Sequence, residues 1–138
     1  MNNGSSSNSW GLTVLRVVVG IVFFAHGWQK VFGMGIHNVA GFFGHAGIPL
    51  PLVSAGIVMT VEFLGGALLI LGVATRLAAG LNAIDMLVAI LAVHLKNGFF
   101  AQSMGVELPL ILMAACICLM IAGPGAASVE WLFARKMS

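Results

Sequence analysis

Two pairs of polar residues in this sequence are of types that can do chemistry, although both lie in very apolar surroundings. The stretch FFAHGWQKVFG places His26 and Lys30 four residues apart, on one face of a helix. Glu62 and Asp85 lie near the middle of two other apolar segments. A desolvated carboxyl group holds its proton more readily than one in water, which suits proton transfer or ligand binding.

The sequence offers Arg16 and Asn82 as partners for these two carboxyl groups. A charge inside a membrane costs roughly 2.5 to 3.5 kcal/mol, so such side chains normally face the protein interior and find partners. One arginine cannot neutralise two carboxylates. Either Arg16 pairs with one carboxylate and the other is protonated, or Arg16, Glu62 and Asp85 share a buried polar network with Asn82. The network either fixes helix register or handles a proton or ligand, and the sequence leaves both open.

A second polar group is expected near the far ends of the apolar segments, where His94 and Glu107 join His26 and Lys30. We expect Lys30 to be mainly an anchor whose amine reaches the membrane surface. The convergence of the others at one level favours a shared pocket above Glu62. The candidate ligand-binding residues are His26, Lys30, Glu62, His94 and Glu107.

His94 and Asp85 are expected to point in opposite directions from their shared helix. The two residues are nine positions apart, about 180° round a regular helix, so we expect them not to face one cavity.

Metal and nucleophile chemistry have little support in the sequence. His26, His94 and Glu107 are of types that bind zinc or iron, but no H-x-x-x-H or E-x-x-H pair accompanies them, and we expect no metal site. Cys116 and Cys118 point about 200° apart on a helix and are interpreted as small apolar fillers. Catalytic residues therefore stay unassigned.

We expect these residues to lie on membrane helices. Of the 138 residues, 60% are hydrophobic and only 7% are charged, whereas roughly a quarter are charged in a soluble domain. The net charge of +2 and the lack of a basic run give no reason to expect nucleic-acid binding. We expect an all-α integral membrane domain over residues 10–138, after a disordered polar tail at 1–9.

Four apolar segments reach the roughly 17 to 25 residues that cross a ~30 Å hydrocarbon core. The spans are expected at 10–32, 52–71, 77–95 and 106–122. The glycine-rich stretch 33–51 predicts a loop with a short membrane-surface piece near 39–43. Small residues such as Gly27 and Gly66 should let the helices approach closely.

Basic residues predict the orientation of this up-down four-helix bundle. One side collects four of them and the other side two, so the positive-inside rule places both termini in the cytoplasm. The four are Arg16, Arg76, Arg135 and Lys136, and the two are Lys30 and Lys96.

Several motifs follow one another in a specific order along residues 12–130. They are the arginine of LR at Arg16, H-G-x-x-K at 26–30, G-I-P at 47–49, E-x-x-G-G-x-x-L-x-x-G-x-x-T-R at 62–76, His94, and G-P-G at 123–125. In this order the chain resembles the DoxX family of small bacterial membrane proteins with four predicted helices. By position, Arg16, His26, Lys30, Glu62, Arg76 and His94 match the recurrent polar residues of that family.

The resemblance implies a multi-pass protein of the bacterial cytoplasmic (inner) membrane that is tied to redox chemistry. The family takes its name from a relative of a subunit of a thiosulfate:quinone oxidoreductase, and other members are associated with oxidative stress or with catechols and quinones. No established reaction comes with the resemblance, so whether the chain is an oxidoreductase, or a subunit of one, stays open. No haem, flavin or iron–sulfur motif is present, so electron transfer would need a quinone or another subunit.

The leading hypothesis is a redox-associated membrane protein that binds a quinone or similar small molecule, linked to oxidative stress or to quinone or thiol-sulfur metabolism. His26 and Lys30 would hydrogen-bond the ring oxygens, and Glu62 would handle a proton. The alternatives are a non-catalytic scaffold for redox partner proteins and a small proton-coupled transporter with Glu62 and Asp85 at its midplane. The expected partners are the lipid bilayer, redox proteins and a second copy of the chain.

Overall fold

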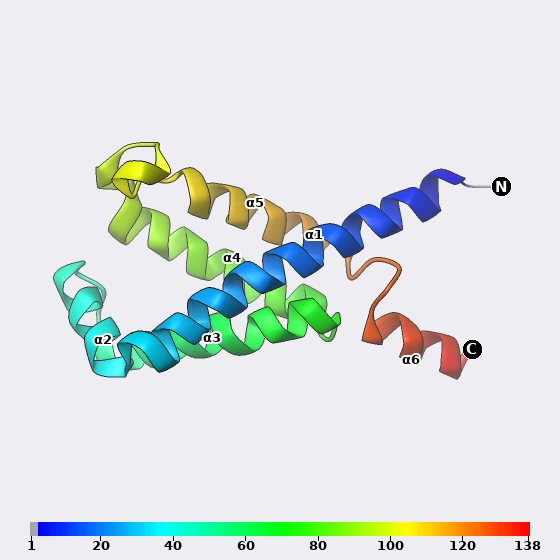
Figure 1. Cartoon of the computed structure of the whole chain (residues 1–138), viewed down its shortest axis with the longest axis horizontal. Coiled ribbons are helices and arrows are strands. Elements are labelled where there is room, and N and C mark those ends of the chain that lie inside the picture. Colours follow the sequence, from blue (N-terminus) through cyan, green and yellow to red (C-terminus); the bar gives the residue numbers. More distant parts are fainter. Residues whose placement is uncertain (1–2) are drawn as a thin grey trace.

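The computed structural model describes residues 3–138, and every element in that range is helical (Figure 1). The α-helices are α1 (Asn3–Trp28), α2 (Ile36–His45), α3 (Pro51–Leu71), α4 (Thr75–Ala89), α5 (Glu107–Ala122) and α6 (Val129–Met137). Two π-helical turns, η1 (Gln29–Met34) and η2 (Ile90–His94), continue α1 and α4, and short 3₁₀ turns cover Leu95–Asn97 and Ala101–Ser103. The all-α prediction is thus confirmed.

Three helical stretches of the described chain are long and apolar enough to cross a membrane. They are Ser6–Met34, Pro51–Leu71 and Thr75–Asn97, with mean hydropathies of 1.7, 2.0 and 1.8. The π-helical turns lengthen the first and third of these stretches. Helix α5 is also apolar but has 16 residues.

Two regions expected to be irregular contain helix. Met1 and Asn2 lie outside the described residues, and the rest of the expected polar tail continues α1. The Ser9 carbonyl oxygen accepts hydrogen bonds from Thr13 Oγ1 and from the backbone N–H of Ala126, both at 3.1 Å, so the loop after α5 packs on this turn. The division into a tail and one domain stays a prediction.

Helix α2 occupies the stretch expected to be a loop with a surface piece. Gly35 has φ +81°, a left-handed conformation that suits glycine, and it breaks the chain between η1 and α2. Val39 and Phe43 are buried against α3, so the short piece near 39–43 is the packed face of a ten-residue helix.

The long apolar helices pack as two pairs, α1 along α3 and α4 along α5. The first pair is in close backbone contact. A Cβ atom on Gly27 would lie 2.4 Å from the backbone nitrogen of Phe63, and one on Gly66 would lie 2.4 Å from that of Phe24. The predicted close approach at these glycines is confirmed.

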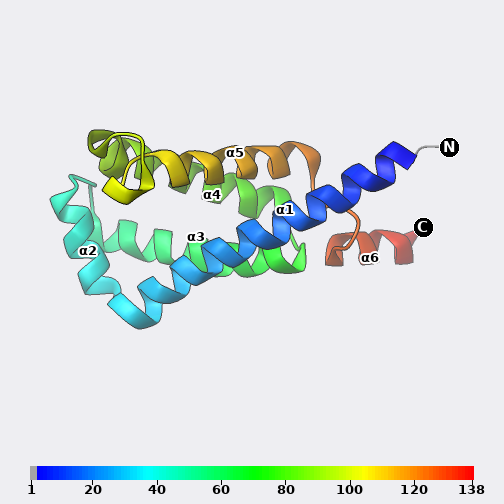
Figure 2. The same ribbon diagram turned by 45° about the horizontal axis from the view of Figure 1, so that its top comes forward.

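The two pairs meet at one end of the molecule and lie farther apart at the other (Figures 1 and 2). We call the first the terminal end; it carries both termini, the α3–α4 turn at 72–74 and the loop at 123–128. We call the second the cavity end; it carries α2 and the loop at 98–105. Between the pairs at the cavity end lies the candidate site.

Candidate functional site: a cavity between two helix pairs

A cavity of about 560 Å³ lies between the helix pairs. Its walls come from α1 and α3 on one side and from α4 and α5 on the other, and Phe42, Phe43 and Met104 lie at the cavity end. Most lining side chains are aliphatic or aromatic. Small-molecule sites typically measure 300 to 1,000 Å³ and combine apolar walls with a few polar groups.

The strongest polar contact in the cavity joins Lys30 to Glu62. Lys30 Nζ lies 2.6 Å from Glu62 Oε2, and the Glu62 residue is only 4% exposed. The lysine sits in η1, and its side chain turns into the protein. The expectation that Lys30 is mainly a surface anchor is therefore wrong: a buried carboxylate offers a charge-assisted hydrogen bond that holds the amine inside.

Asp85 lies beside this ion pair on α4. Glu62 and Lys30 are close enough to act electrostatically on its carboxyl group, and its Oδ2 atom is buried without a hydrogen-bond partner in the described part of the chain. Glu62 faces the interior as the sequence predicts. Three helices thus bring one ammonium and two carboxyl groups to the same cavity.

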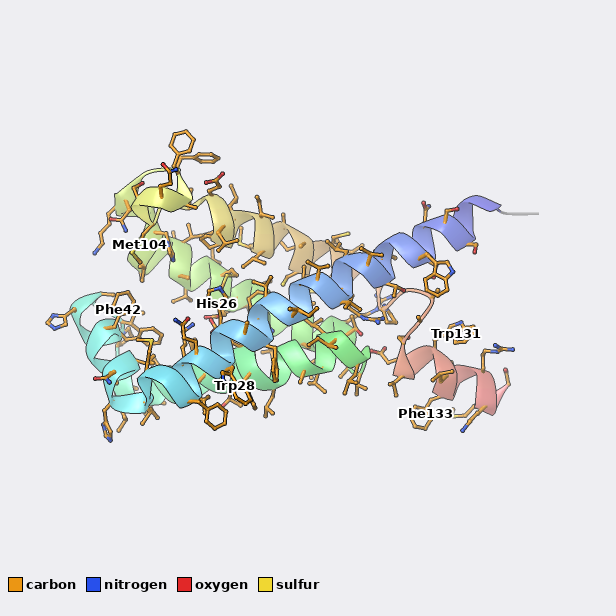
Figure 3. The ribbon with its side chains drawn as sticks, viewed as in Figure 1. His26, Trp28, Phe42, Met104, Trp131 and Phe133 are labelled. Atoms are coloured by element: carbon orange, nitrogen blue, oxygen red, sulfur yellow. The ribbon has the colours of Figure 1, made fainter. Side chains whose placement is uncertain are left out.

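The two histidines stand at the edge of the cavity. His26 is exposed at its rim, and Figure 3 shows it on the side of α1 that faces α4 and α5, opposite Trp28. His94 Nδ1 lies 2.7 Å from the carbonyl oxygen of Met104. A carbonyl oxygen can only accept, so Nδ1 carries the proton in this contact, and Nε2 stays available.

His94 and Asp85 line the same cavity, which contradicts the expectation from helical phase. The π-helical turn η2 at Ile90–His94 explains the difference. A π-helix closes its hydrogen bonds over five residues instead of four, so each residue rotates less than in an α-helix. The π-helical turn therefore changes the direction in which the His94 side chain points relative to that of Asp85.

Arg16 pairs with neither carboxyl group. It is 1% exposed at the terminal end, where its guanidinium donates to the carbonyl oxygens of Pro124 and Ala127, the latter at 2.6 Å. These carbonyls belong to the loop that follows α5, where the backbone has left its helical pattern and needs donors. The planar fork of arginine meets this need, so the expected network of Arg16 with Glu62 and Asp85 is not formed.

Asn82 and Glu107 have local roles outside this cluster. Asn82 is fully buried, and its Nδ2 donates to the carbonyl oxygens of Ala78 at 3.0 Å and Val61 at 3.3 Å, which ties α4 to α3. Glu107 Oε2 accepts from the backbone N–H of Ala101 at 2.8 Å and does not line the cavity.

The candidate site that the geometry assembles differs in membership from the sequence hypothesis. It contains His26, Lys30, Glu62 and His94 from the ligand candidates and Asp85 from the expected network. The sequence hypothesis left Asp85 out of the ligand-binding residues because a regular helix would point it away from His94. Its carboxyl group in the middle of an apolar segment was the signal that could have added Asp85 to the site. Among the described residues, no group of three His, Cys, Asp or Glu side chains is arranged to hold a metal ion.

Comparison with known proteins gives a consistent group of relatives. The DoxX family model matches residues 11–95. The chain is 36% identical to the putative oxidoreductase CatD of Bacillus subtilis over 82% of this chain and 79% of the relative. It is 34% identical to an uncharacterized protein of Haemophilus influenzae over 99% and 100% of the two chains. It is 30% identical to the inner membrane protein YqjF of Escherichia coli over 91% and 94%. No solved structure matches the chain significantly.

Proposed function

The chain belongs to the DoxX family, and from this premise we propose that it is a four-span inner-membrane protein that binds a quinone or similar small molecule between its helix pairs. The observation that carries the proposal is the Lys30–Glu62 pair, with His26 nearby, on the wall of an otherwise apolar cavity. Apolar walls accommodate a ring, and the few polar groups orient it.

The fourth span in this proposal is α5. Its 16 residues extend about 24 Å at 1.5 Å per residue, somewhat less than a ~30 Å hydrocarbon core. Its apolar sequence and its packing along α4 favour a crossing. Both termini lie at one end (Figure 1), which fits an even number of spans. Arg16, Arg76, Arg135 and Lys136 gather at that end, so the positive-inside rule places it in the cytoplasm.

The cavity is placed to receive a ligand from the bilayer itself. Ile57 and Ile84 line it from facing helices, yet they are 58% and 62% exposed. These side chains lie along the spans, so the surface they expose there faces lipid rather than water. A quinone dissolved in the membrane can then place its ring in the cavity and leave its isoprenoid tail in the lipid.

Each polar residue of the cavity has its own role in the proposed binding of a quinone. A quinone offers two acceptor oxygens, and its reduction consumes protons. The ammonium of Lys30 has three N–H donors, one of which goes to Glu62, so others remain for a ring oxygen. His26, exposed at the rim, supplies a second donor through its ring N–H. Glu62 keeps the ammonium in place.

The proposed redox role is that of a subunit rather than a complete enzyme. One relative is named a putative oxidoreductase, and another is an inner membrane protein. The sequence carries no motif for a resident redox group, so electrons would come from a partner protein. That partner would reduce or oxidise the quinone held here.

The test is quinone binding by the protein in lipid nanodiscs, measured calorimetrically with a short-chain ubiquinone. We expect saturable binding at one site per chain. His26→Ala should weaken it by about two- to tenfold, since a lost hydrogen bond costs roughly 0.5 to 1.5 kcal/mol. The matched control is His45→Ala, because His45 is exposed at the end of α2 and does not line the cavity. Absence of saturable binding, or equal loss in both variants, contradicts the proposal.

A small proton-coupled transporter is the second candidate, favoured by the adjacent carboxyl groups of Glu62 and Asp85. Protein in liposomes would then move protons together with a solute, and Glu62→Gln would abolish the flux. No flux above that of empty liposomes removes this candidate.

A further inference from the structure

We propose that Asp85 is the proton-bearing carboxyl group of the cavity, and that it donates a hydrogen bond to an uncharged acceptor oxygen of the ligand. The inference rests on the proposed function for the presence of a ligand in this cavity. The protonation of Asp85 is a property of the empty protein and can be measured alone.

The charges that face Asp85 leave it without a cation of its own. Lys30 is the one lysine or arginine that lines the cavity in the described chain, and its ammonium already lies 2.6 Å from Glu62 Oε2. The other polar or titratable groups nearby carry no permanent positive charge. They are His26 at the rim, His94 on η2, the buried thiol of Cys116 on α5 and the amide of Asn82 one turn earlier on α4.

Protonation of one carboxyl group makes the cluster neutral. Two charged carboxylates side by side in an apolar space repel each other and lose their hydration, which is expensive with a single cation to balance them. One Lys30–Glu62 ion pair and one neutral Asp85 remove the excess charge.

Contacts decide which of the two carboxyl groups keeps the proton. Glu62 has the ammonium as its partner, which stabilises its charged form. Asp85 has a buried oxygen without a partner, and a buried carboxylate oxygen in this state is costly. Glu62 and Asp85 line the same cavity, so in the empty protein the Glu62 carboxylate can accept the Asp85 proton. A ligand oxygen can take its place as acceptor.

This arrangement predicts which ligands the cavity accepts. Lys30 and Asp85 lie on different helices, α1 with its π-helical turn and α4, so they offer donors from two sides of the cavity. Because Glu62 already balances the positive charge of Lys30, an anionic ligand gains little attraction from Lys30 and is repelled by the Glu62 carboxylate. The cavity should therefore favour a neutral molecule with carbonyl oxygens, such as a quinone, over a carboxylate of the same size.

Infrared spectroscopy of the purified protein in nanodiscs at pH 7 tests the protonation directly. We expect a carbonyl stretching band of a protonated carboxyl group that shifts in D₂O. Asp85→Asn should remove this band, and Asp85→Glu should keep a band at an altered frequency. The control Glu107→Gln should leave it unchanged, because Glu107 lies outside the cavity. A wild-type spectrum without the band, or a band unaffected by both Asp85 variants, overturns the inference.

Addition of a short-chain ubiquinone separates this inference from the proposed function. Three results together would support both the proposed function and the role of Asp85. The Asp85 band shifts when the quinone binds, Asp85→Leu loses affinity for the quinone roughly tenfold, and the carboxylate 4-hydroxybenzoate binds to wild type at least tenfold more weakly than the quinone. If quinone binds and wild type lacks the band, or the band stays unshifted, this inference falls and the function stands. If the band belongs to Asp85 and no quinone binds, the function falls and the protonation of Asp85 stands.

Discussion

The terminal end and the cavity end each place a basic side chain of the first membrane helix inside the protein, but the two side chains have different surroundings. Arg16 is 1% exposed and donates to the backbone carbonyls of one loop. Lys30 is partly exposed to the cavity and pairs with Glu62. Arg16 is thus enclosed by backbone that it holds in place, whereas Lys30 keeps donors that face an open space.

Further contacts tie backbone segments together at the terminal end. Glu130 Oε1 accepts from the backbone N–H of Thr75 at 2.6 Å, and the N–H of Glu130 donates to the Gly72 carbonyl oxygen at 3.1 Å. These bonds join α6 and the α3–α4 turn. A buried charge that is surrounded by backbone groups, such as Arg16, holds a loop in place, whereas we propose that the charge pair facing a cavity belongs to a binding site.

The largest effect on stability is expected at the terminal end. Arg16→Leu removes two hydrogen bonds from a charged donor and leaves the carbonyls of Pro124 and Ala127 unpaired. Each such bond contributes roughly 1.5 to 3 kcal/mol, so we expect a loss of about 3 to 6 kcal/mol. Reversible unfolding in SDS measures this change.

The matched control is Lys96→Met at the cavity end, which removes an exposed charge and should change stability by less than about 0.5 kcal/mol. Equal losses in both variants would contradict the distinction between the two ends.

The next largest effect is expected at the contact between α1 and α3. Gly27→Ala places a Cβ atom 2.4 Å from a backbone nitrogen of α3, which cannot move without shifting the helix. We expect destabilisation of about 3 kcal/mol, read from the same unfolding assay. Gly41→Ala is the control, since a Cβ atom there has no neighbour within 4 Å, and it should be neutral or stabilise α2. A tolerated Gly27→Ala would show that the pair can separate.

A smaller effect on stability is expected in the cavity, together with a large effect on binding. Lys30→Met leaves Glu62 without its cation and should lower the free energy of unfolding by about 1 to 2 kcal/mol. The loss stays this small because the carboxylate can take up a proton in compensation. Lys30→Met/Glu62→Gln should recover most of this loss, while quinone binding stays lost in both. Additive losses in the double variant would show that the two side chains do not interact.

The sequence predicts the elements of this protein better than their contacts. Composition and the length of the apolar segments identify the long apolar helices but not α2 or the start of α1, and the mid-span position of Glu62 predicts its burial. The glycine pattern also predicts close approach between helices, and the structure shows that α1 and α3 are such a pair. These features depend on local sequence and on general membrane physics.

The partners of the buried charges depend on geometry that the sequence does not display. The assignment of Arg16 to the carboxyl groups assumed that similar depth means contact, whereas the guanidinium bonds to the loop after α5. The separation of His94 from Asp85 assumed a regular helix, and η2 changes the phase. Because no residue type marks a π-helical turn, the joint cavity had to come from the structure.

The central claim, that a quinone sits between the helix pairs at the cavity end, is tested most directly by photolabelling. An azido-quinone is activated on the protein in nanodiscs, and the labelled peptides are identified by mass spectrometry. We predict labels on residues that line the cavity, within 23–30, 57–62 and 84–94, with loss of label when excess ubiquinone competes. Labels confined to the side of α1 that carries Trp28, or spread evenly and insensitive to competition, would contradict the claim.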